Sequence, residues 1–137
     1  MVLFLAGQAW SDRTNSPTAW VASNCAYLLH EIDAIYLELE ARPGPPPFVD
    51  KLITSLIKHA RSYQKELDLR FAQEDLSSFE REVLKLAQDL ISKIISLLES
   101  LRDLIRGQMS QQVKEVFLKT RTEAWDSLHQ LKNLKSI

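Results

Sequence analysis

The fold of this chain is decided by residues 79–105, FEREVLKLAQDLISKIISLLESLRDLI. Their apolar side chains recur at steps of three and four residues, which is the spacing of one face of an α-helix. At 100° per residue this face covers about half of the helix circumference, with Ile94 at its centre. A single neighbouring helix could not bury so wide a face, so we expect this helix to pack against at least two others.

Two more helices are predicted before this one and one after it. Ser16-Pro17 has the residue types of a helix start, and the prolines from Pro43 to Pro47 require the first helix to end. Ser77 and Glu80 have the spacing of a capping box, and Gly107 suits the turn after the third helix. The expected helices span about residues 16–42, 48–73, 78–106 and 110–136.

Four helices of similar length with short connections favour one topology. Short links place successive helices side by side and antiparallel. We therefore predict an all-α, up-down-up-down antiparallel four-helix bundle. It would be a single domain of residues 1–137, with an apolar N-terminal extension at residues 1–15.

Composition and charge indicate in which compartment such a bundle is found and which classes of partner it binds. The 17 basic and 18 acidic side chains leave a net charge of −1, so nucleic-acid binding is not expected. The single cysteine, Cys25, cannot form an internal disulfide, and its apolar helical setting predicts a small buried side chain in a reducing compartment. The apolar start, residues 1–6, is too short to span a membrane. We expect a cytoplasmic or otherwise intracellular protein without a membrane segment.

The sequence contains no arrangement of residues typical of an enzyme. Glycine-rich phosphate loops, a nucleophile elbow, and paired-cysteine or paired-histidine metal motifs do not occur in it. Asp126 and His129 form one acid-x-x-His pair, whereas a di-metal bundle needs two such pairs and two further glutamates. Both side chains are expected to project away from the apolar face. We therefore predict a non-enzymatic protein with no cofactor and no metal.

The fourth predicted helix carries apolar side chains outside its core face. They lie in one column with three cations, and the column comprises Lys114, Leu118, Arg121, Trp125 and Lys132. Apolar area flanked by cations suits an acidic, leucine-rich partner helix, so we predict these five residues as a partner-binding site. In the alternative interpretation, Leu118 and Trp125 lean onto a neighbouring helix while the cations extend past them.

The first predicted helix has an outer face with little charge, which we expect something to cover. This face comprises Ala26, Tyr27, His30, Ala34, Leu37 and Ala41. The chain's own N-terminal stretch, which includes Leu3, Phe4 and Trp10, could fold back over it. The alternative is another partner or a second copy of the protein, and the second copy would give a homodimer through this helix and the N-terminal segment.

A proline-rich link joins the first two helices, three long amphipathic helices follow it, and the third helix opens with Glu80–Leu90, EREVLKLAQDL. In these features the chain resembles the focal-adhesion-targeting bundles of adhesion kinases and their scaffold relatives. The resemblance implies a module that binds short acidic, leucine-rich helices on its faces. We accordingly predict a protein–protein interaction bundle of the adaptor or scaffold type, which binds a partner helix or self-associates.

Two other functions are alternatives at this point. The run His129–Lys132 resembles the His-x-x-Lys of histidine phosphotransfer domains, four-helix bundles with one exposed histidine, although Asn133 stands where that family has glycine. A small nucleic-acid-associated subunit could use Lys51, Lys58 and Lys65, spaced by seven residues, together with the fourth helix.

Overall fold

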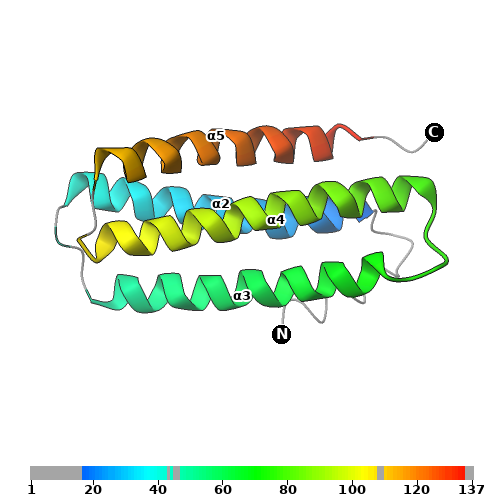
Figure 1. The fold of residues 1–137 in the computed structure, drawn as a ribbon, viewed down its shortest axis with the longest axis horizontal. Coiled ribbons are helices and arrows are strands. Elements are labelled where there is room, and N and C mark those ends of the chain that lie inside the picture. The colour runs from blue at the N-terminus through cyan, green and yellow to red at the C-terminus, as the bar shows by residue number, and fades with distance from the viewer. Residues whose placement is uncertain (1–16, 43, 45–46, 108–109, 135–137) are drawn as a thin grey trace.

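The computed structural model describes residues 17–42, 44, 47–107 and 110–134, and these form an all-α structure. Its four helices are α2 (Pro17–Ala41), α3 (Phe48–Phe71), α4 (Ser78–Ile105) and α5 (Gln111–Lys132). Each helix runs antiparallel to the one before it (Figure 1). The predicted up-down-up-down four-helix bundle is therefore confirmed. The predicted N-terminal extension lies outside the described residues.

Local sequence signals set the helix ends. The Ser77 hydroxyl accepts from the Glu80 amide and the Glu80 carboxylate accepts from the Ser77 amide, both at 3.1 Å, which confirms the capping box at the start of α4. Gly107 follows α4 with a φ of 85°, a conformation that glycine adopts without strain. The fourth helix was predicted to reach residue 136 but ends at Lys132, where the last turn tightens: the amides of Asn133 and Leu134 donate to the carbonyls of Gln130 and Leu131, three residues back.

The most apolar helix, α4, lies at the centre of the bundle. It packs against α2, α3 and α5, which confirms that it has at least two neighbours, and Ile94 is fully buried. The helices α3 and α5 do not pack on each other, and α2 packs more closely on α4 than on α3. In the side view of Figure 1, α2 and α4 lie in the middle of the bundle, between α3 and α5.

The close packing of α2 on α4 leaves α2 and α3 bridged by aromatic side chains instead of tightly packed. The Trp20 and Tyr63 rings meet edge to face with centroids 5.3 Å apart, and the Tyr27 and His59 rings do so at 6.1 Å. Two side chains that fit the apolar helical spacing of residues 48–71 are consequently exposed, Phe48 by 64% and Leu52 by 37%. The spacing alone predicts an inward position for both, which is wrong because α2 packs on α4 and not over them.

A third residue that departs from the sequence pattern is Val116 in α5: its apolar spacing predicts a place in the core stripe, but it is exposed. The next residue, Phe117, is fully buried and takes the inward position. Val116 therefore lies about 100° around the helix from the core-facing direction.

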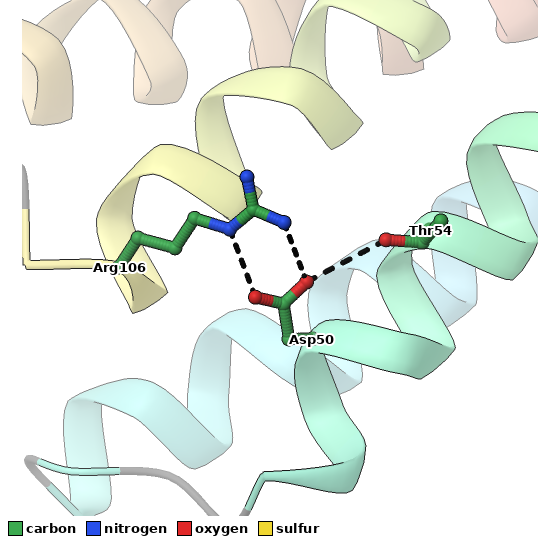
Figure 2. A network of polar contacts seen from close by, with 3 residues as sticks. All are labelled: Asp50, Thr54 and Arg106. Atoms are coloured by element: carbon green, nitrogen blue, oxygen red, sulfur yellow. Dashed lines mark hydrogen bonds and ion pairs between the residues drawn. The ribbon is translucent and has the colours of Figure 1, made fainter.

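An ion pair ties the start of α3 to the end of α4 (Figure 2). Asp50 accepts two hydrogen bonds from Arg106, at 2.8 and 3.0 Å, and a third from the Thr54 hydroxyl at 3.5 Å. The hydrogen bonds from Arg106 hold the pKa of the Asp50 carboxyl below its ordinary value of 3.8. Each charge also complements the dipole of its own helix end.

Replacing Ile94 by alanine tests the central position of α4. We expect Ile94→Ala to lower the free energy of unfolding by about 2–5 kcal/mol, because it leaves a cavity where three helices meet. Urea denaturation measures this loss. The matched variant Val116→Ala, which truncates an exposed β-branched residue, should change stability by less than about 0.5 kcal/mol. Equal losses for the two variants would contradict the helical phase of α4.

The Asp50–Arg106 pair predicts a pH dependence of stability. Because the pKa of Asp50 is lowered in the folded state, its stabilising effect is present above the pKa of the unfolded chain and is lost as pH falls below about 4. The stability difference between wild type and Arg106→Gln, measured by urea denaturation, should therefore shrink between about pH 6 and pH 2.5. A difference that stays constant over this range would contradict the assignment.

Candidate functional site: the α2–α5 seam

Four of the five predicted partner-binding residues lie along the line where α5 meets α2. We call this line the α2–α5 seam and define it by His30, Asp33, Leu37 and Glu40 on α2, with Lys114, Leu118, Arg121 and Trp125 on α5. Lys132 lies at the end of α5 and is exposed.

Two ion pairs fix how the helices lie along the seam. The Arg121 guanidinium donates from Nε to Asp33 Oδ1 and from Nη2 to Asp33 Oδ2, the latter at 3.0 Å, and Lys114 Nζ lies 3.5 Å from Glu40 Oε2. The hydrogen bonds to Asp33 raise the pKa of Arg121 above its ordinary value, so this cation stays charged. The two pairs set the register of α5 against α2.

Two leucines occupy the outer surface between these ion pairs. Leu37 lies four residues after Asp33 and three before Glu40, and Leu118 lies four after Lys114 and three before Arg121. In antiparallel helices held by these pairs, the two leucines therefore lie within about 1.5 Å of one level, the rise of one residue. Leu37 is 67% exposed and Leu118 is 37% exposed. The seam thus presents an apolar pair with one ion pair on either side of it along the helix axes.

The other end of the seam is built around Trp125, which is partly buried against the core. Its indole meets the His30 ring of α2 nearly edge-on, with centroids 5.1 Å apart, and the His129 ring lies 6.5 Å away on α5. The indole Nε1 is buried and has no hydrogen-bond partner among the described residues. Trp125 therefore serves as packing between α2 and α5, with two exposed histidines beside it.

A stacked aromatic pair is buried between α2 and α5 on the inner side of the seam. Tyr36 of α2 lies nearly parallel to Phe117 of α5, with ring centroids 4.9 Å apart, and both rings are buried. Burial, with a smaller effect from Glu40, raises the pKa of Tyr36 to about 12. The tyrosine therefore stays neutral and contributes buried packing between α2 and α5, next to the two leucines in sequence.

The structure brings four of the five predicted residues onto the seam, but it uses three of them to hold α2. Arg121 and Lys114 contact acids of α2, and Trp125 contacts His30. This corresponds to the alternative interpretation, in which the column leans onto a neighbouring helix. Leu118 is the member that keeps an apolar surface toward solvent, and the role of the five residues in partner binding stays a prediction.

Sequence reasoning missed the acidic half of the seam. Asp33 and Glu40 are seven residues apart, as are Lys114 and Arg121 on α5. Equal spacing of opposite charges on two antiparallel helices places both pairs in contact at once. The signal was therefore present, but its use requires knowing that α5 lies beside α2.

The groups considered for chemistry lie apart from one another. Asp126 and His129 are exposed, as predicted, and in the described part of the chain no three side chains of His, Cys, Asp or Glu gather as metal ligands would. Cys25 is buried as predicted, and burial raises the pKa of its thiol to about 12. No helix among residues 17–42, 47–107 and 110–134 is both long and apolar enough to cross a membrane.

The basic side chains considered for nucleic acid are divided between two helices. Lys51, Lys58 and Lys65 are exposed on α3, whereas the cations of the seam belong to α5. The helices α3 and α5 lie on opposite sides of α4 (Figure 1). A nucleic-acid surface that combined both sets would have to extend around the bundle.

Comparison of the chain with models of protein families, with curated proteins and with solved structures finds no match. Its function therefore has to be argued from the surfaces described above.

The bidentate pair between Asp33 and Arg121 should couple α2 to α5 measurably. In a double-mutant cycle with Asp33→Asn and Arg121→Gln, we expect a coupling free energy of about 0.5–1 kcal/mol, because the pair is half-buried but still reached by water. Urea denaturation of the four proteins measures it. A coupling energy of zero would show that the pair does not hold the seam together.

Proposed function

We propose that this protein is a non-enzymatic interaction module whose α2–α5 seam docks an amphipathic helix of a partner protein. The observation that carries the proposal is the exposed pair Leu37 and Leu118, held at nearly one level between two ion pairs. Such a ridge offers apolar area to a partner and a polar rim that fixes its orientation.

The stiffness of the seam supports this use. Two ion pairs bracket the leucines from either end, and the Tyr36–Phe117 stack is buried on the inner side of the seam. A surface already held in its binding geometry loses little conformational entropy when a partner docks.

The charges along the seam favour a partner with carboxylates beside its apolar stripe. A guanidinium has five N–H donors, and Asp33 uses two of those of Arg121. Lys132 is exposed and forms no ion pair with the residues that the structure describes. Carboxylates on a partner helix could add to the Arg121 network and pair with Lys132, while leucines at i, i+3, i+4 and i+7 cover Leu37 and Leu118.

A synthetic helix tests the proposal directly. The probe is a fluorescent peptide of about fourteen residues with leucines at i, i+3, i+4 and i+7 and glutamates beside them. We expect saturable binding in fluorescence anisotropy, with amide chemical-shift changes centred on Leu37 and Leu118. Leu118→Glu should weaken binding at least about tenfold, because it places a charge in the apolar contact.

Two controls make the result specific to the seam. Leu69 of α3 is 68% exposed, so Leu69→Glu is a matched change of an exposed leucine elsewhere and should leave binding unchanged. A peptide of the same composition in scrambled order should bind much more weakly. Shift changes on another face, or equal effects of the two glutamate variants, would exclude the seam as the docking site.

A further inference from the structure

The side of α2 that faces α3 carries an apolar groove. One hollow of about 250 Å³ is lined by residues of both helices, including Ala34, Ile35, Phe48 and Leu52. A second, of about 530 Å³, lies beside Tyr27 and His59, farther toward the start of α2. We call these two hollows together the α2–α3 groove. Their walls include large exposed apolar side chains, which a soluble bundle normally covers.

From this geometry we infer that residues 1–16 of the same chain dock into the α2–α3 groove. The segment begins MVLFLA and has Trp10 farther along, so it carries an apolar surface that needs cover. It enters the bundle at Pro17, the first residue of α2, and Pro17 disfavours helical geometry at the residue before it. A change of direction at Ser16 would allow the segment to return along the side of α2.

The lengths are compatible with this path. Along α2 from Ser23 to Leu39 the groove measures about 24 Å at 1.5 Å per residue. Sixteen residues span about 50 Å if extended and about 24 Å if helical. The segment can therefore reach the hollows beside Tyr27 and Ala34 in either conformation.

The groove is also the side of α2 that the bundle leaves open. On its other side α2 is held to α5 by Asp33–Arg121, Glu40–Lys114 and the contact of His30 with Trp125. Toward α3, aromatic side chains bridge a wider gap. A segment attached at Pro17 is present at an effective concentration of the order of millimolar, which favours it over a second copy or a separate protein.

Disulfide trapping tests this inference, because the single native cysteine does not interfere. Cys25 is buried and the pKa of its thiol is raised to about 12, so it forms little reactive thiolate. Cysteines introduced in turn as Leu3→Cys, Phe4→Cys and Leu5→Cys are each combined with Ala34→Cys or Leu52→Cys. After mild oxidation of dilute protein, we expect cross-linked monomers on non-reducing gels for at least one of these pairs.

Matched pairs on the far side of the bundle are the control. The same N-terminal cysteines combined with Val116→Cys or Leu118→Cys on α5 should give at least tenfold less cross-linked monomer. Equal cross-linking to α5, no cross-linked monomer with any groove pair, or disulfide-linked dimers as the main product would each overturn the inference. Dimers would assign the groove to a second copy.

A second test uses no introduced cysteines, because replacing an apolar residue of the segment by cysteine itself weakens docking. The double change Leu3→Asp with Phe4→Asp should empty the groove, increase the fluorescence of a bound apolar dye severalfold and shift the amide signals of Tyr27, Ala34, Leu52 and His59. The helical circular dichroism of the bundle should persist. The polar control Gln112→Glu, an exposed position on α5 away from the groove, should leave dye fluorescence and these signals unchanged. Unchanged signals in the double variant would also overturn the inference, independently of the outcome at the α2–α5 seam.

Discussion

Burial of the broad apolar face of α4 is the constraint on which the rest of this structure depends. Eleven residues of α4 are buried, against seven of α3, and each large aliphatic side chain withdrawn from water stabilises the fold by about 1.5–3 kcal/mol. Three neighbours are needed to cover such a face. The first helix, α2, is therefore drawn toward α4 and packs on it across the bundle, at the expense of its contact with α3.

The polar contacts have a different role, because each contributes little free energy. Pairs such as Arg61–Glu99 and Asp50–Arg106 join α3 to α4, and Asp33–Arg121 joins α2 to α5, all of them partly exposed. Exposed ion pairs contribute at most about 1 kcal/mol. Their matched spacing nevertheless selects one register, since sliding α5 by one turn along α2 would separate both seam pairs together. Apolar burial therefore determines that the helices pack, and charge determines how they align.

The parts of the structure that could be predicted are those that depend on neighbours in sequence. The capping box of Ser77 and Glu80, the turn at Gly107 and the inward position of Ile94 follow from spacing alone. The exposure of Phe48 could not be foreseen, because it depends on where α2 lies relative to α3. The proposed docking seam shows the same division: the spacing on α5 identifies its column of side chains, but not that α2 supplies acids to two of the cations.

The interior of the bundle bears on the kind of function that its surface can support. Apart from the apolar residues, tyrosines and tryptophans, Ser127 is the one buried side chain among the described residues, and it accepts a hydrogen bond from Lys93. Catalysis by tuned acids and bases needs titratable groups held in sheltered but accessible positions. Here burial raises the pKa of Cys25 and of Tyr63 inside the core, where both stay neutral and only packing is required of them. Recognition by ridges and grooves needs no such groups, and the docking surface proposed above is built from apolar side chains that α2 and α5 leave exposed, Leu37 and Leu118.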